Sequence, residues 1–453
     1  MRSLKYESLR IGAIYFLILL GIALWVRDIP NQPDAFNITL QQLIKTSAWS
    51  DPTYFATAAL DIAENGWISS ANDWIFNLWP PGFMLLQALI VKMLGHGAPV
   101  ILVLQILAAG LFSAVLVLLY ELLNDRRVNS KASFALPLLI FAFPVTRVFL
   151  LQPAGISLGE NFAIGFFLIC MLLAFRSVIR NKIRYAVYAG LCLALSAYFR
   201  SQFEIILLAL TGWGVLLIIS VSLTSLRKVI EPKFALSVVK TIAIVLFIAN
   251  AATVPWRAYH WIYQGNPSWV QTSELVFANS VMTSEQLNKK RGGFVVAGGG
   301  NLVCRIDPAT CGDVMNAKML FVKTFIEHPV EWYSLKFDVI REYWFSSIQN
   351  WTRVNVKSES VDIVTNGLIF VILIALVVLL FTRKIKSHSL WILLIWFNAS
   401  LFSAYTLILT VVHFEVRYFF FPKIVGLVMF LIVVGLYFRP MKKIDTMNQW
   451  IEK

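Results

Sequence analysis

The 453-residue sequence contains few charged residues and few residues of the kinds that bind metals or act as nucleophiles. Only 14% of the residues are charged and 58% are hydrophobic, which is too apolar for a water-soluble protein of this length. The chain has five histidines and four cysteines, and it has no Walker loop, Gly-x-Ser-x-Gly or His-Glu-x-x-His sequence. These absences give no support to a P-loop NTPase, an α/β-hydrolase or a zinc metalloprotease.

The formal charge of +14 raises the question of nucleic-acid binding. The basic residues, however, cluster in the short segments between apolar runs, where the positive-inside rule places them in membrane proteins. No basic stripe lies on a predicted soluble domain. We therefore expect membrane lipids as a partner and no nucleic acid.

Apolar runs of about 20 residues predict an all-α polytopic membrane protein with about ten transmembrane helices. The first run lacks a small-residue cleavage site and is expected to act as a signal anchor. Basic residues flank six of the loops on one side, so both termini are expected in the cytoplasm. The expected spans are 11–27, 99–121, 133–150, 161–179, 184–200, 203–224, 236–255, 361–382, 389–412 and 418–437.

The spans divide the chain into three predicted parts. Residues 1–255 form a transmembrane catalytic module with a long first outer loop, 28–98. Residues 256–360 form a large outer segment, and 361–453 form the last spans and a basic tail. Both outer loops are expected to carry interfacial helices: 83–94, which is too short to span, and 329–345, which has an apolar face for lipid.

The four cysteines fall into two kinds. Cys170 and Cys192 lie in apolar runs and are expected to be buried small hydrophobes. Cys304 and Cys311 bracket a polar stretch that we place outside the cytoplasm, where a disulfide is favoured. Two free thiols are the alternative, because sequence does not supply the geometry that a bridge requires.

Two carboxylates are expected at the outer boundary. Asp51 and Pro52 begin a predicted helix whose apolar stripe includes Tyr54, and Asp51 could serve only as its N-cap. Glu160 lies in the outer turn before the fourth span, where it could simply favour the helix macrodipole. Together the two could act as a general base and an organiser of phosphate or metal.

Basic residues at the outer ends of spans break the positive-inside trend and suggest an anionic ligand, because arginine binds phosphate with a planar fork. Snorkelling toward lipid, or an ordinary interfacial position, is the alternative for each of them. The candidates for phosphate binding are Arg200, Arg417, Arg257 and His260. The supporting candidates are Tyr54, His413, Glu415 and Tyr418.

The order of these motifs resembles the GT-C superfamily of membrane glycosyltransferases, in particular protein mannosyltransferases and lipid A aminoarabinose transferases. Asp51-x-x-Tyr54 followed by Pro80-Pro81-Gly82 is similar to their first outer loop, although Trp79 stands where those enzymes carry a lysine. Further similar segments are Ser157-Leu158-Gly159-Glu160, Val254-Pro255-Trp256-Arg257, His328-Pro329 and Glu415-Val416-Arg417-Tyr418.

The resemblance implies an inverting transfer from a polyprenyl-phosphate-linked sugar to a glycan, lipid or protein acceptor. It implies that Asp51 is the base and that Glu160 supports the donor phosphate or a metal; the cofactor is otherwise unknown, with a divalent metal as one option. The expected location is a bacterial inner membrane, with the site facing the periplasm. The alternatives are a polysaccharide polymerase or ligase, and a transporter or flippase; transporters, however, place polar residues at the membrane midplane.

Overall fold

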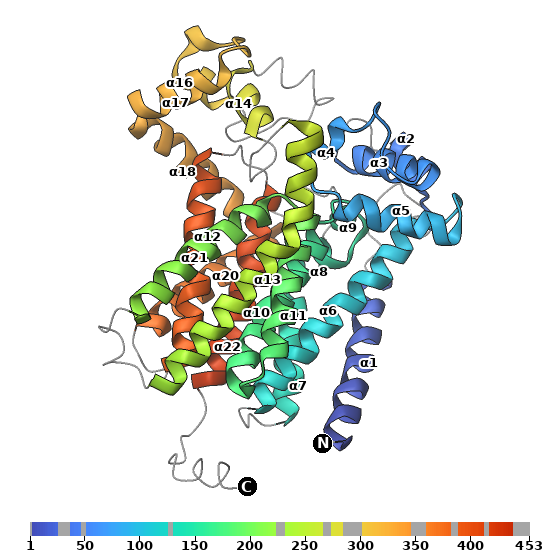
Figure 1. The fold of residues 1–453 in the computed structure, drawn as a ribbon, viewed down its shortest axis with the longest axis vertical. Coiled ribbons are helices and arrows are strands. Elements are labelled where there is room, and N and C mark those ends of the chain that lie inside the picture. The colour runs from blue at the N-terminus through green and yellow to red at the C-terminus, as the bar shows by residue number, and fades with distance from the viewer. Residues whose placement is uncertain are drawn as a thin grey trace.

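The computed structural model describes residues 2–25, 37–46, 51–125, 130–222, 232–265, 273–283, 301–345, 359–381, 388–411 and 416–437. These residues form helices joined by turns, with no strand among them. Long helices run roughly side by side, and two groups of shorter helices lie at one end (Figure 1). We call this the loop-bearing end. The opposite end, where α1 begins and α22 finishes, is called the terminal end.

Among the described residues, seven helices are long and apolar enough to cross a membrane, so the chain is a multi-pass helical membrane protein. Two shorter apolar helices, α11 (Ile183–Phe199) and α22 (Phe420–Tyr437), also coincide with expected spans. The count of ten stays a prediction. The seven helices are α1 (Arg2–Trp25), α6 (Val100–Asp125), α10 (Glu160–Arg180), α12 (Gln202–Ser222), α13 (Pro232–Gln264), α20 (Glu359–Phe381) and α21 (His388–Val411).

The third expected span, 133–150, contains a sharp bend, so this segment is either one broken span or a re-entrant loop. The chain forms α7 (Ser130–Leu138) and η1 (Leu139–Ala142), bends by 81°, and continues as α8 (Pro144–Leu151) and α9 (Pro153–Ile156). Pro144 is the cause, because proline has no N–H and holds the preceding residue in an extended conformation.

Two buried amides satisfy backbone carbonyls at the end of α8, the helix that follows the bend. The Asn161 side chain donates to the Leu150 carbonyl at 3.3 Å, and the Gln105 side chain donates to the Leu151 carbonyl at 3.1 Å. Irregular backbone at membrane depth persists only where such groups are satisfied within the protein. The chain then enters α10, which begins at the loop-bearing end (Figure 1) and has Glu160 as its first residue.

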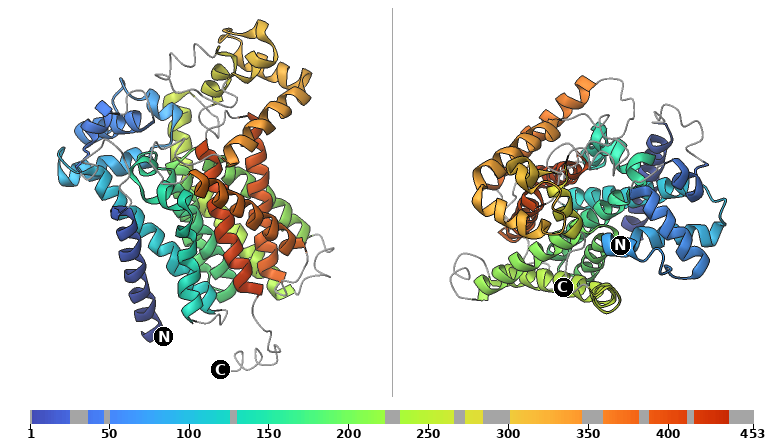
Figure 2. Two further views of the ribbon diagram at one scale, coloured as in Figure 1. Left: turned by 180° about the vertical axis from the view of Figure 1, so that it is seen from behind. Right: turned by 90° about the horizontal axis from the view of Figure 1, so that it is seen from above.

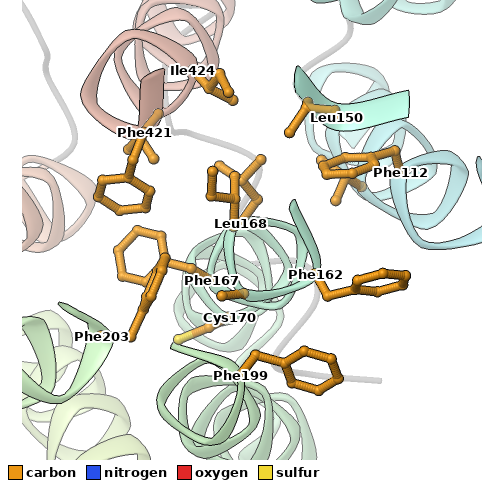
Figure 3. Packing of buried hydrophobic residues seen from close by; sticks show 14 of the residues in the cluster. Phe112, Leu150, Phe162, Phe167, Leu168, Cys170, Phe199, Phe203, Phe421 and Ile424 are labelled. Atoms are coloured by element: carbon orange, nitrogen blue, oxygen red, sulfur yellow. The ribbon is translucent and has the colours of Figure 1, made fainter. Parts of the chain in front are cut away.

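Helix α10 runs through the middle of the bundle and is packed on several sides by aromatic rings (Figure 3). The ring centroids of Phe162 and Phe199 of α11 are 5.6 Å apart, and those of Phe167 and Phe421 of α22 are 5.3 Å apart. Cys170 is buried here, as predicted, and Cys192 is partly buried. This packing holds α10 in place, including its first turn, which begins at Glu160.

The first group at the loop-bearing end contains α2 (Leu40–Thr46), α3 (Asp51–Asn65), α4 (Trp74–Leu78) and α5 (Gly82–Leu94). The predicted apolar stripe of α3 packs inward, and α5 is the expected short helix. Asp61 closes the turn after α3 by accepting hydrogen bonds from the Ser69 backbone N–H at 2.7 Å and from its hydroxyl at 2.6 Å. Burial opposes ionisation of Asp61, but these hydrogen bonds outweigh it and lower its pKa.

The second group contains α14 (Ser273–Val281), α16 (Leu302–Ile306), η2 (Pro308–Thr310), α17 (Ala317–Glu327) and α18 (Pro329–Phe345). It has its own small core around Phe321 and Trp332. Cys304 and Cys311 form a disulfide, with their Cα atoms 4.7 Å apart. The two groups lie on different sides of the loop-bearing end (Figure 2). Helix α13 runs past the expected boundary at residue 255, which therefore falls inside a helix.

Helix α18 does not lie with its predicted apolar face in lipid. Trp332, expected to face lipid, is buried, and its indole donates to the Thr410 carbonyl at 3.1 Å. Lys336, expected on the polar face, is also buried, and burial lowers its pKa to about 7. Val330 and Phe337 are exposed instead. The helix packs on α20 and α21, and a sequence pattern does not reveal which face meets protein.

Candidate functional site

A hairpin of two antiparallel helices brings Glu160 and Arg200 together. Helices α10 and α11 pack along their length and are joined by a tight turn at Asn181, whose φ of 48° lies in the left-handed region that asparagine tolerates. Glu160 is the first residue of α10, and Arg200 follows the last residue of α11. Each charge suits its helix end, since the macrodipole favours an anion at the N-terminus and a cation at the C-terminus.

Arg200 lies between two carboxylates. Its Nη2 atom is 2.9 Å from Glu160 Oε1 and 3.7 Å from Asp51 Oδ2, and its Nη1 atom donates to the Leu158 carbonyl at 3.3 Å. The Glu160 side chain is 1% exposed and that of Arg200 is 7% exposed, whereas that of Asp51 is 22% exposed. The three residues predicted separately from the sequence therefore form one charge cluster, in which Asp51 is the member open to solvent.

The first group of helices delivers Asp51 to this cluster through aromatic contacts. Asp51 is the first residue of α3 rather than the residue preceding the helix. One turn later, the Phe55 ring lies 5.7 Å from the Arg200 guanidinium carbon, within cation–π range. Phe55 also meets Trp79 and Phe83 edge to face, at 5.3 and 5.7 Å. Asp51 thus stands on a helix whose position is fixed by packing.

Two glycines allow the backbone to come this close. A Cβ atom on Gly82 would lie 2.6 Å from the Tyr198 carbonyl oxygen, so only glycine lets α5 begin against the end of α11. Gly159 has a φ of 73°, and a Cβ there would lie 2.5 Å from the Phe83 ring. Both positions belong to the motifs that resemble the GT-C pattern.

Tyr54 stands between Asp51 and a group of tryptophans. Its ring stacks on Trp79 at 5.8 Å and meets Trp74 edge to face at 5.2 Å. Burial, followed by the negative charge of Asp51, raises the pKa of the Tyr54 phenol. Tyr54 is therefore a hydrogen-bond donor near the carboxylate at neutral pH. Trp79, at the place of the family lysine, is buried in aromatic contacts and carries no charge to a phosphate.

Arg257 and His260 both lie on the last turns of α13, at the same end of the molecule. Arg257 is half-buried and within electrostatic range of Glu204 and Tyr198. One imidazole nitrogen of His260 lies 2.8 Å from the Phe76 carbonyl, which joins α13 to the first group. Arg257 thus stays a candidate for phosphate binding, while one nitrogen of His260 is already engaged in a structural contact.

The remaining predicted residues are only partly visible. His413 and Glu415 lie outside the described residues, and Arg417 belongs to η3 (Val416–Phe419) but its side chain lies outside them too. Tyr418 is partly buried. Their predicted roles stay predictions.

Tyr405 of α21 was missed by the sequence analysis. It is partly buried, its ring stacks on the Phe421 ring with centroids 5.6 Å apart, and it lies within electrostatic range of Glu160 and Tyr418. Its hydroxyl has no hydrogen-bond partner among the described residues. A tyrosine deep in an apolar run was the available signal, because a buried phenol usually finds a partner.

The described residues of the site do not provide a set of ligands for a metal ion. Among the residues that the structure describes, no three His, Cys, Asp or Glu side chains gather in a way that could hold one. At the carboxylates themselves, the Arg200 guanidinium lies where a bridging cation would sit. The positive charge between the two carboxylates therefore comes from Arg200.

The chain matches no protein-family model, no curated protein and no solved structure. The resemblance to GT-C glycosyltransferases therefore rests on the sequence motifs of this chain alone. A buried guanidinium, a semi-exposed carboxylate and a nearby phenol can accept a proton from a hydroxyl and stabilise negative charge on a departing group.

Proposed function

We propose that the protein is an inverting glycosyltransferase that moves a sugar from a polyprenyl-phosphate donor to an acceptor hydroxyl. The observation that carries the proposal is the Asp51–Arg200–Glu160 cluster at the loop-bearing end. Two carboxylates and a nearly buried arginine are costly at the end of apolar helices, and such groups usually mark a functional site. The motif resemblance supports the same conclusion.

The two carboxylates have different roles in this proposal because their exposure differs. Glu160 is 1% exposed and 2.9 Å from Arg200, so it positions the guanidinium. Asp51 is 22% exposed and 3.7 Å away, so a hydroxyl can reach it. Asp51 takes the proton of the acceptor hydroxyl while that oxygen bonds to the anomeric carbon. The bond from that carbon to the phosphate oxygen breaks, and its electrons leave with the lipid phosphate.

Positive charge and hydroxyl donors near the cluster suit the leaving phosphate. Arg257 presents a guanidinium at the same end of the bundle, and Tyr405 has a buried hydroxyl in electrostatic range of Glu160. Arginine stabilises phosphate oxygens with paired N–H groups. In the proposal, these two residues bind the donor phosphate, the role expected of the GT-C lysine that Trp79 replaces in this chain.

A lipid-linked donor fits the place of the site. The cluster lies at the ends of apolar helices, where a polyprenyl tail can stay in the bilayer while its phosphate reaches Arg200 and Arg257. Basic residues such as Arg180, Lys182 and Arg184 mark the terminal end as cytoplasmic under the positive-inside rule. The proposed site therefore faces the outside, in a bacterial cell the periplasm, where nucleotide sugars are absent.

The test is transfer of a radiolabelled sugar by the purified full chain in proteoliposomes. Polyprenyl-phosphate-linked mannose, glucose, galactose and aminoarabinose are supplied with cell-envelope glycans, lipids and peptides as acceptors. The proposal predicts label on an acceptor together with release of polyprenyl phosphate. Uptake or flipping of label across the bilayer, without cleavage of the sugar–phosphate bond, would instead show a transporter and overturn the proposal.

A further inference from the structure

An open aromatic surface lies next to the charge cluster, on the side of Tyr54. The Trp74 ring meets the Tyr54 ring edge to face at 5.2 Å, and yet 41% of Trp74 is exposed. Trp67 is 42% exposed and meets Phe76 and Tyr259 edge to face, at 5.6 and 5.7 Å. Both tryptophans are held by neighbouring rings on one side and are open on the other.

Fixed, half-open indoles differ from the tryptophans of an ordinary interfacial belt. Trp261 of α13 illustrates the ordinary kind, since it is 67% exposed and makes no ring contact among the described residues. A ring that is already held in place loses little conformational freedom when a ligand stacks on it. Trp74 and Trp67 therefore have the rigidity of binding residues.

Polar groups accompany the rings. Asp73 precedes α4, and its carboxylate makes no capping hydrogen bond to that helix. The Trp67 indole N–H donates to the Tyr259 hydroxyl at 3.4 Å, which leaves the phenol's own proton for another acceptor. Each indole thus has one polar neighbour, the Asp73 carboxylate beside Trp74 and the Tyr259 hydroxyl beside Trp67. A flat apolar face with a polar group at its edge matches a pyranose ring, which has a face of C–H groups and a rim of hydroxyls.

We propose that Trp74, with Asp73, binds a saccharide unit of the acceptor and presents its hydroxyl to Asp51. The acceptor is therefore a glycan or a glycolipid headgroup rather than a polypeptide side chain. Tyr54 follows Asp51 by three residues on the first turn of α3, and its ring meets the Trp74 ring, so the aromatic surface begins one helical turn from the reacting carboxylate. The catalytic part of this inference rests on the proposed function, whereas saccharide binding does not.

The test measures binding directly, on the full chain in lipid nanodiscs without a donor. The probes are methyl glycosides and short oligosaccharides of glucose, galactose, mannose and N-acetylglucosamine, followed by saturation-transfer NMR and tryptophan fluorescence. We expect at least one series to bind, and Trp74→Ala to weaken it about tenfold or more through loss of stacking. Trp74→Phe keeps a ring and should retain most of the affinity, and Asp73→Asn should weaken binding severalfold.

Trp261→Ala is the matched control, because it removes an exposed indole from the same end of the molecule. It should leave saccharide binding unchanged. No binding by any probe, or equal binding by wild type and a folded Trp74→Ala, would overturn the inference. Sugar transfer onto a peptide without saccharide binding would overturn it while the proposed function stands. Saccharide binding without cleavage of any donor would overturn the proposed function while the saccharide-binding inference stands.

Discussion

Arg200 is the residue through which the other charges of the site are organised. It is the positive partner shared by two carboxylates that come from separate parts of the chain. A buried ion pair contributes little net stability, because desolvation opposes the attraction, but removal of one partner leaves a buried charge uncompensated. The structure therefore gives Arg200 a role in stability as well as in the proposed chemistry, and a double substitution can separate the two.

We expect Arg200→Gln to lower the free energy of unfolding by about 3 kcal/mol, since Glu160 loses its charged partner at 2.9 Å. Arg200→Gln combined with Glu160→Gln should recover much of that loss and remain inactive. Thermal unfolding in detergent, followed by intrinsic fluorescence, measures the stability. Additive effects of the two substitutions would contradict a direct pair.

At this scale the sequence identifies the charges but not their partners. Glu160 and Arg200 can be found because ionisable residues are rare at the ends of apolar runs. Their pairing with Asp51 could not be deduced, because it depends on how α3 docks on the hairpin. Tyr405 was missed because the sequence does not show that this tyrosine of α21 lies within electrostatic range of Glu160.

At the scale of elements, the positions of α5 and α10 depend on two close backbone contacts. Helix α5 starts against the end of α11, and its Phe83 ring covers Gly159 immediately before α10. Both contacts need the absence of a side chain. The short apolar segment over 83–94 could be assigned from its length, whereas its docking partner could not.

We expect Gly159→Ala to displace α5 and to reduce transfer strongly. The left-handed backbone at φ 73° costs an alanine about 1–2 kcal/mol, and the added Cβ would lie 2.5 Å from the Phe83 ring. Gly97→Ala is the matched control, because a Cβ at that position meets nothing within 4 Å. Equal transfer rates for the two variants at equal membrane abundance would count against this account of the turn.

Two segments differ in shape or in packing from what their sequence pattern suggests, each for its own physical reason. The span expected over 133–150 is bent by 81° because Pro144 interrupts it, and the composition stays apolar throughout. In α18, Lys336 is buried although its spacing places it with charged residues. Periodicity shows that a helix has two faces, but the surrounding protein decides which one is covered.

At the scale of the whole molecule, the two ends of the bundle differ in their basic residues and in the short helices that they carry. The loop-bearing end carries both groups of short helices (Figures 1 and 2). The turn between α10 and α11, at the terminal end, is basic and contains Arg180, Lys182 and Arg184. The order of apolar and basic segments was enough to predict this general arrangement. The exact number of spans was not, because several helices are short or broken.

We expect the terminal end to be cytoplasmic. A cysteine introduced at Ser130, where α7 begins, should react with a membrane-impermeant maleimide only after permeabilisation. A cysteine at the exposed Ser70, in the first group, should react in intact cells. The reverse pattern would place the proposed site in the cytoplasm and would remove the argument for a lipid-linked donor.

The central claim is that Asp51 is the general base for sugar transfer. Asp51→Asn keeps the size of the side chain but does not accept the proton, and general-base catalysis contributes about 10²–10⁴-fold to a rate. Glu64→Gln is the matched control, since it removes an exposed carboxylate, 55% accessible, from the same helix. The most direct measurement is the rate of labelled-sugar transfer from polyprenyl phosphate by both variants in proteoliposomes. We predict at least a hundredfold loss for Asp51→Asn and a near-wild-type rate for Glu64→Gln. Near-wild-type transfer by Asp51→Asn, at equal membrane abundance, would contradict the account.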